Sequence, residues 1–80
     1  MPNGGVTLRT IRDGLRRPMT LEEVAALVRT QFGFKCTAGH LSNIERGTGL
    51  ASARLRAALA AIYGRPRVDI DRAYARTQPN

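Results

Sequence analysis

The chain has 80 residues, with 13 basic and six acidic side chains, a formal net charge of +7 and a single cysteine. This length is enough for one domain, and a chain this small buries only about 60% of its unfolded surface, so a partner would help to stabilise it. One cysteine excludes an internal disulfide framework, and no apolar run approaches the roughly 20 residues that cross a bilayer. The start, MPNGGVT, lacks the charged and apolar regions of a secretion signal. We therefore expect a soluble, cytoplasmic domain without a membrane partner.

The excess of positive charge is almost entirely arginine, which accounts for 12 of the 13 basic residues. A small basic domain favours a polyanionic partner, with nucleic acid ahead of an anionic membrane surface. A GC-rich genome also enriches arginine, so composition alone leaves both explanations open. Residues 1–19 carry +3 and residues 51–80 carry +4, whereas residues 20–50 are neutral. The positive charge therefore flanks the centre of the chain.

The first predicted helix covers about residues 6–15, where Leu8, Ile11 and Leu15 recur at helical spacing. Gly14 weakens its end, and Pro18 stops it because the residue before a proline disfavours the helical conformation.

A second helix, about residues 20–31, has the clearest start signal, since Thr20 and Glu23 form a capping box. Gly33 is placed to end it, and either Phe34 or Cys36 is expected to turn inward in the short link that follows. A third helix, about residues 37–46, is capped by Thr37 and ended by Gly47.

The fourth helix follows a Ser52 cap, carries Leu55, Leu59 and Ile62 on one face, and ends at Gly64. A last short helix is predicted after an Asp69 cap, with Ile70 and Tyr74 fitting either the core or a dimer interface. No segment alternates as a strand. The sequence thus predicts an all-α domain of five short helices.

Helix 20–31, a short link and helix 37–46 form the pattern of a helix-turn-helix. With TLEEVA at residues 20–25, LSNIERG at residues 41–47 and a leucine-spaced helix 55–62 ending in Tyr63-Gly64, the chain resembles the lambda-repressor-like (Cro/C1-type, XRE) family over about residues 7–75. The resemblance implies a lambda-repressor-like fold that binds double-stranded DNA. This chain departs from the family in a lengthened turn between the two helices, which affects the angle of the second helix on DNA, and in Ala38 and Gly39, where many relatives have long polar side chains.

The resemblance assigns a role to each matched position. Base reading in the major groove falls to the first half and outer face of helix 37–46, at Thr37, Ala38, Gly39, His40, Ser42 and Asn43. Phosphate contacts are expected at the start of the preceding helix, in the loop after the motif and from the flanking cations: Arg16, Arg17, Thr20, Leu21, Lys35, Arg46, Thr48, Arg54 and Arg56. Glu45 matches a buried glutamate of the family whose partner by position is Arg12, the alternative being an ordinary solvated acid.

Several of these positions allow a second interpretation. The Asn43 amide can pair with N6 and N7 of one adenine or can contact only phosphate, and His40 can contact DNA or be a plain surface residue. Gly39 fits either close approach to DNA or drift at a tolerant site. Cys36 and His40 have zinc-like spacing, but a tetrahedral site needs four ligands, so neither a metal nor another cofactor is expected.

We expect residues 1–6 to form a flexible arm, residues 7–76 the DNA-binding domain and residues 77–80 a flexible end. The chain has no nucleophile, phosphate-binding loop or acidic cluster in a catalytic pattern, so an enzyme is not expected. The leading hypothesis is a sequence-specific transcriptional regulator, a small repressor of the phage or mobile-element type. It would act as a homodimer on a palindromic operator in the bacterial nucleoid. The alternative is an antitoxin-like module that binds a partner protein and also regulates its own gene.

Overall fold

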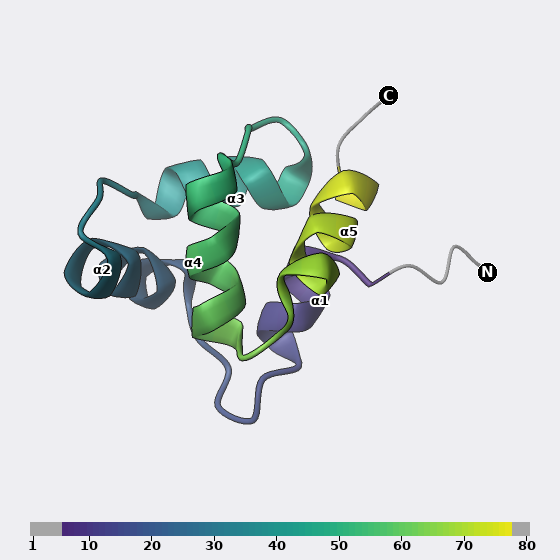
Figure 1. Ribbon diagram of the computed structural model, residues 1–80, viewed down its shortest axis with the longest axis horizontal. Coiled ribbons are helices and arrows are strands. Elements are labelled where there is room, and N and C mark those ends of the chain that lie inside the picture. The colour runs from purple at the N-terminus through teal and green to yellow at the C-terminus, as the bar shows by residue number, and fades with distance from the viewer. Residues whose placement is uncertain (1–5, 78–80) are drawn as a thin grey trace.

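A computed structural model describes residues 6–77, and Figure 1 shows their five helices. They are α1 (Leu8–Asp13), α2 (Leu21–Phe32), α3 (Ala38–Arg46), α4 (Ala53–Tyr63) and α5 (Arg67–Thr77), and the described residues contain no strand. The predicted all-α fold of five helices is confirmed. Residues 1–5 of the expected arm and residues 78–80 of the expected flexible end lie outside the described residues, whereas Thr77 is the last residue of α5.

The helices begin at the hydroxyl residues that the sequence marks. In the α2 capping box the Glu23 backbone N–H donates to Thr20 Oγ1 at 3.1 Å, and the Thr20 N–H donates to Glu23 Oε1 at 2.8 Å. Thr37 caps α3 by accepting the His40 N–H, and Ser52 caps α4 by accepting the Leu55 N–H. Each bond satisfies an N–H that the first helical turn leaves without a partner.

Two glycines end the helices of the central pair. Gly33 follows α2 with φ of 73° and Gly47 follows α3 with φ of 85°, a left-handed conformation that costs glycine little because it has no Cβ. Both ends agree with the sequence prediction.

The first and last helices differ from their predictions. The first is shorter than residues 6–15, because Thr7 caps it at Leu8 and Gly14 already leaves the helical conformation. The last helix is longer than expected and does not begin at Asp69. It starts at Arg67, directly after Pro66, whose ring needs no N–H partner at a helix start, and Asp69 lies in the first turn.

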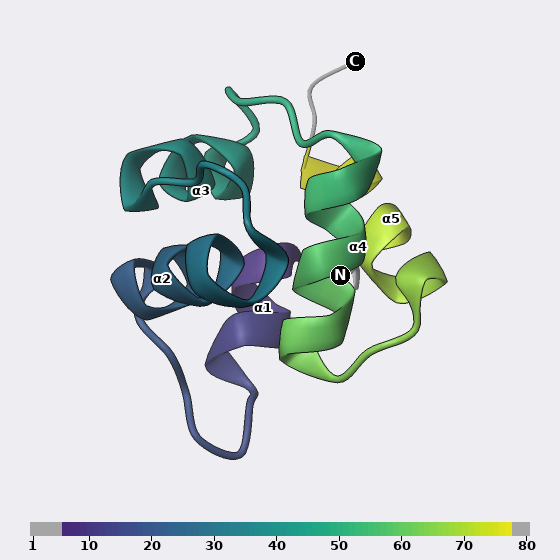
Figure 2. The same cartoon turned by 60° about the vertical axis from the view of Figure 1, so that its left-hand side comes forward.

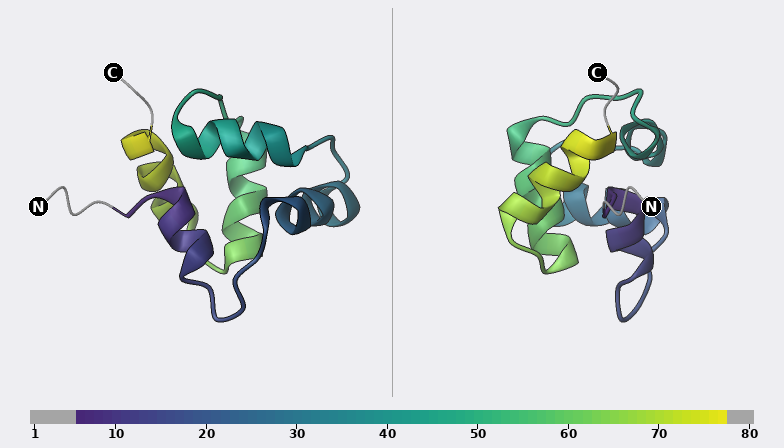
Figure 3. Two further views of the ribbon diagram at one scale, coloured as in Figure 1. Left: turned by 180° about the vertical axis from the view of Figure 1, so that it is seen from behind. Right: turned by 90° about the vertical axis from the view of Figure 1, so that its right-hand side faces the viewer.

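The core takes apolar side chains from all five helices and from the links between them. Ile70 is fully buried, so it is a core residue, and Cys36 is buried in the α2–α3 link while Phe34 packs against the core half-buried. In Figure 2, α2 and α3 lie on one side of the molecule and α5 on the other. Seen from behind, in the left view of Figure 3, α3 lies across the front of α4. None of the helices within residues 6–77 is long and apolar enough to span a membrane.

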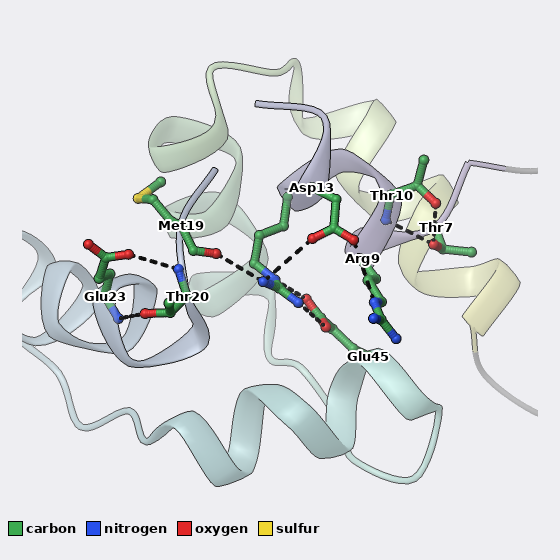
Figure 4. A network of polar contacts seen from close by, with 9 residues as sticks. Thr7, Arg9, Thr10, Asp13, Met19, Thr20, Glu23 and Glu45 are labelled. Atoms are coloured by element: carbon green, nitrogen blue, oxygen red, sulfur yellow. Dashed lines mark hydrogen bonds and ion pairs between the residues drawn. The ribbon is translucent and has the colours of Figure 1, made fainter. Parts of the chain in front are cut away.

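An ion pair joins α1 to α3. Arg12 Nε donates to Glu45 Oε2 at 2.8 Å, and Nη2 donates to Oε1 at 3.0 Å, so the pair is bidentate. The third nitrogen, Nη1, donates to the carbonyl of Met19 at 2.9 Å, and dashed lines from Met19 and Glu45 mark these bonds in Figure 4. The two side chains are only 13% and 10% exposed. This pairing, predicted from the family resemblance, raises the pKa of Arg12 mainly through the hydrogen bonds to Glu45.

We expect Glu45→Ala to lower the free energy of unfolding by about 2–4 kcal/mol, because it leaves the Arg12 guanidinium mostly buried without its anion. Asp13→Ala is the matched control. Its carboxylate lies 3.7 Å from Arg12 but is 57% exposed, so we expect a loss of less than about 1 kcal/mol. Denaturant unfolding at neutral pH measures both, and equal losses for the two variants would contradict a structural role for the pair.

Candidate nucleic-acid interface

Two buried side chains anchor α3, and most of its other residues are free to contact a ligand. Leu41 and Ile44 are 3% and 1% exposed and pack into the core. The six residues predicted to read bases lie around the first two turns: Thr37, Gly39, His40 and Asn43 are exposed, and Ala38 and Ser42 are half-buried. The structure therefore brings the predicted base-reading residues together on one short helix.

The Asn43 side chain is held in place rather than free. Its Oδ1 accepts a hydrogen bond from Arg46 Nη2 at 2.6 Å, one helical turn further along α3. An amide oxygen has two lone pairs, so Oδ1 can still accept another bond while the amide nitrogen donates. Arg46 thus orients the amide and places a positive charge beside it.

The loop after α3 is fastened to the end of that helix. The backbone N–H groups of Thr48 and Gly49 donate to the Asn43 carbonyl at 2.9 and 3.0 Å. A Cβ on Gly49 would lie only 3.0 Å from the Asn43 Cβ and 3.1 Å from the Ile44 nitrogen, so the close approach requires glycine. The loop therefore fixes the backbone beneath Asn43.

At Gly39, unlike Gly49, the described chain leaves room for a side chain. A Cβ there would meet nothing in the described chain closer than Thr37 Oγ1 at 4.0 Å. Packing within the protein therefore does not require this glycine.

The lengthened turn between α2 and α3 is braced by two arginines. Arg29 Nη1, near the end of α2, donates to the Cys36 carbonyl at 2.7 Å, just before the α3 cap. The Arg54 guanidinium lies 4.4 Å from the centre of the Phe34 ring, a cation–π contact from α4 to the link. Sequence reasoning missed Arg29, whose only signal is a cation in the last turn of a helix.

The start of α2 offers backbone donors. The N–H groups of Leu21 and Glu22 have no acceptor within the described residues, because the capping box uses only those of Thr20 and Glu23. Helix N-termini of this kind bind phosphate, although the exposed Glu22 carboxylate opposes an anion here.

Three predicted phosphate-contacting cations make no side-chain hydrogen bond, ion pair or ring contact within the described part of the chain. Arg16 and Arg17 are exposed in the connection between α1 and α2, and Lys35 is exposed in the link before α3. The α1–α2 connection and the α3–α4 connection project from opposite ends of the molecule (Figures 1 and 2). Because they have no internal contact, Arg16, Arg17 and Lys35 are available to a polyanion without breaking an ion pair within the protein.

Two other side chains that were predicted to contact phosphate instead make hydrogen bonds within the protein. Arg56 donates to Asp71 Oδ1 at 2.8 Å and to the Ala51 carbonyl at 2.6 Å, and its guanidinium lies over the Tyr74 ring. The Thr48 hydroxyl and N–H both donate to the Asn43 carbonyl. The Arg56 side chain is held by these contacts and is only 23% exposed, and the Thr48 hydroxyl proton is already donated, so we leave Arg56 and Thr48 out of the proposed interface.

The tyrosine beside Arg56 has a structural role. The Ala51 N–H donates to the Tyr74 hydroxyl at 3.0 Å, which ties α5 to the start of α4. Tyr74 therefore packs within the domain.

The chemistry of the site is that of hydrogen bonding and charge. Residues 6–77 contain no group of three or more His, Cys, Asp and Glu side chains that could hold a metal ion. Burial raises the pKa of the Cys36 thiol, so it stays protonated at neutral pH although Arg29 partly offsets the effect. The surface thus combines amide, imidazole, guanidinium and hydroxyl groups around one helix.

Comparison with known proteins agrees with this arrangement. A model described as a helix-turn-helix domain matches residues 5–73. No curated protein and no solved structure matches the chain. The matched range includes all of α2 and α3 and both members of the Arg12–Glu45 pair.

Proposed function

The chain belongs to the helix-turn-helix domain family of DNA-binding proteins, and we propose that it is a sequence-specific transcriptional regulator that reads the major groove with α3. The observation that carries this proposal is the division of α3 into a two-residue apolar anchor and an outer surface of exposed polar groups. These exposed polar groups do not pack within the domain. Hydrogen-bond donors and acceptors placed this close together suit the edges of DNA bases.

In the proposed complex the first turns of α3 enter the major groove. Thr37, Gly39, His40, Ser42 and Asn43 lie closest to base edges, with Ala38 offering an apolar contact to a thymine methyl group. Phosphates on either side are bound by the cations Arg16, Arg17, Lys35, Arg46 and Arg54, and by the free N–H groups at the start of α2.

We propose that regulation occurs by occupancy: a bound protein denies polymerase access to the operator, as in a small phage-type repressor located at the nucleoid. A domain of this size contacts few base pairs, so two copies on a palindromic operator would give the required specificity. Their half-sites would lie about 34 Å apart, one turn of DNA.

In vitro selection from random duplexes tests the function. We expect enrichment of a short two-fold symmetric sequence. Recovery of no enriched sequence would contradict sequence-specific regulation.

Asn43→Ala should weaken binding to the selected operator by about 1–3 kcal/mol and binding to a scrambled duplex by little, because the amide contacts a base and carries no charge. The dependence of affinity on salt should stay the same. Fluorescence anisotropy on both duplexes at several salt concentrations measures this. Equal weakening on both would show that Asn43 contacts only the DNA backbone.

Gly39→Ala tests whether this glycine is needed for the helix backbone to approach DNA closely or is a tolerant surface position. Because the position has free space and lies inside a helix, alanine should stabilise the fold by about 0.5–1 kcal/mol. If the helix backbone approaches the DNA as proposed, the same variant should bind the operator more weakly despite its higher melting temperature. Unchanged operator affinity would identify Gly39 as a tolerant surface position.

Removal of Arg16 and Arg17 together should make the plot of log affinity against log salt shallower by about 1.8 for each bound copy, or about 3.6 for two copies on one operator, since each phosphate contact contributes about 0.9. Arg72→Ala with Arg76→Ala is the matched control, because it removes two exposed cations from α5, on the far side from α2 (Figure 2). An equal change in both double variants would mean that net charge, rather than the α1–α2 connection, sets the slope.

A further inference from the structure

A hollow lies between the start of α1 and α5, away from the proposed DNA interface. Its volume is about 210 Å³, and six residues line it: Val6, Ile11, Arg65, Asp69, Arg72 and Arg76. None of the six is assigned to DNA in the proposed complex. The left view of Figure 3 shows α1 and α5 side by side, and the two helices are in contact. Three arginines and one aspartate give this α1–α5 hollow a formal charge of +2.

Two of these arginines have no partner in the described chain. The Arg72 and Arg76 side chains are exposed and make no hydrogen bond, ion pair or ring contact within residues 6–77. They lie four residues apart on α5, so they share one side of the helix, where like charges repel each other. The helix dipole favours a cation in the last turn, which accounts for Arg76 but not for Arg72, one turn earlier. An anion bound across both guanidinium groups would neutralise this repulsion.

The rest of the hollow offers a hydrogen-bond acceptor and apolar contact. Asp69 Oδ2 lies 3.6 Å from Arg65 Nη1, and the Asp69 side chain is 35% exposed. An ionised carboxylate has several lone pairs, so Asp69 can also accept a hydrogen bond from a hydroxyl group. Val6 is 41% exposed although its side chain is apolar, and the other apolar lining residue, Ile11, is buried. The hollow therefore combines cationic, acceptor and apolar groups.

The volume of the hollow limits the size of its ligand. A water molecule takes about 30 Å³ in the liquid, so the hollow holds about seven waters. It is smaller than the roughly 300 Å³ at which drug-sized sites begin, and it is larger than a single phosphate group needs. A ligand that fills it therefore has a short carbon skeleton beside its anionic group.

We propose that the α1–α5 hollow binds a small phosphate monoester, with its phosphoryl oxygens on Arg72 and Arg76 and a hydroxyl group on Asp69. A phosphate monoester carries nearly two negative charges and three terminal oxygens at neutral pH, which matches two planar guanidinium groups better than one carboxylate does. Guanidinium groups bind such oxygens through paired, charge-assisted hydrogen bonds. The inference goes beyond the proposed function and does not depend on it, because the hollow and the DNA interface share no residue.

Isothermal titration calorimetry of the full chain tests the site with two probes, inorganic phosphate and glycerol 3-phosphate, at neutral pH and constant ionic strength. We expect one molecule of either probe to bind per chain. Glycerol 3-phosphate should bind about tenfold more tightly, the factor that one hydrogen bond to a charged group contributes.

Arg72→Ala with Arg76→Ala should weaken binding of both probes by at least about tenfold, because the phosphoryl group loses its charged donors. Arg9→Ala with Arg67→Ala is the matched control. It removes two cations from α1 and α5 that are 74% and 45% exposed and do not line the hollow. Exposed charges interact weakly through water, so the control should change the affinities by less than about threefold. Thermal melts without phosphate check that each variant folds.

Asp69→Ala separates the hydroxyl contact from the phosphoryl contact. The variant removes a negative charge beside the anion, so binding of inorganic phosphate should be retained or strengthened. The preference for glycerol 3-phosphate should fall from about tenfold toward onefold, because its hydroxyl group loses the charged acceptor.

The alternatives give different results. Equal weakening in the two double variants would show that net charge alone attracts the anions, and it would overturn the site. Equal affinity of the wild-type protein for both probes, or a preference that survives in Asp69→Ala, would overturn the monoester as its ligand. Loss of operator affinity in the Arg72 and Arg76 variant but not in the control would assign these cations to DNA instead. Failure of the in vitro selection would overturn the regulator and leave the phosphate site standing.

Discussion

The bidentate ion pair between Arg12 and Glu45 is the contact on which the proposed reading surface depends. Helix α3 has only nine residues and two large apolar anchors, too few to fix both its position and its rotation through packing alone. The pair adds a directional contact, because a planar guanidinium and a carboxylate meet well in one geometry. Since the same guanidinium also holds the Met19 carbonyl, it connects α1, the approach to α2 and α3 through a single group. On α4, Tyr63 is buried, and its pKa is raised first by that burial and then by the negative charge of Glu45.

Arginine serves two purposes in this protein, and composition cannot separate them. Within residues 6–77, Arg9, Arg12, Arg56, Arg65 and Arg67 have an acidic partner within 4 Å. Arg29 binds a backbone carbonyl and Arg54 stacks on an aromatic ring. The positive charge of our proposed interface therefore comes from a minority of the basic residues. They have no acidic partner within residues 6–77 and are Arg16, Arg17, Lys35, Arg46 and Arg54.

Contacts local in sequence were predictable, and contacts distant in sequence were not. The caps at Thr20, Thr37 and Ser52 and the glycine ends were readable because each involves residues at most a few positions apart. The ion pair of Arg56 was not predictable, because its partner Asp71 lies 15 residues away and nothing in the sequence shows that α4 and α5 meet there. The Arg12–Glu45 pair spans 33 residues and was reached only through the family resemblance. The start of α5 was missed because Asp69 was preferred as a cap over Pro66.

The lengthened turn affects which of the family's DNA contacts can be assigned to this chain. A longer connection would ordinarily leave the start of α3 poorly fixed, and the base-reading groups with it. Here Arg29 binds the last carbonyl before the cap, Arg54 covers Phe34, and the loop after α3 binds the Asn43 carbonyl, so both ends of the helix are fastened. Groups already ordered before binding lose less conformational entropy when they bind. The first turn of α3 and the oriented Asn43 amide therefore form one preorganised surface. The sequence specificity that we propose therefore depends on the contacts of Arg29 and Arg54 with the α2–α3 link as much as on the residues of α3 that match the family.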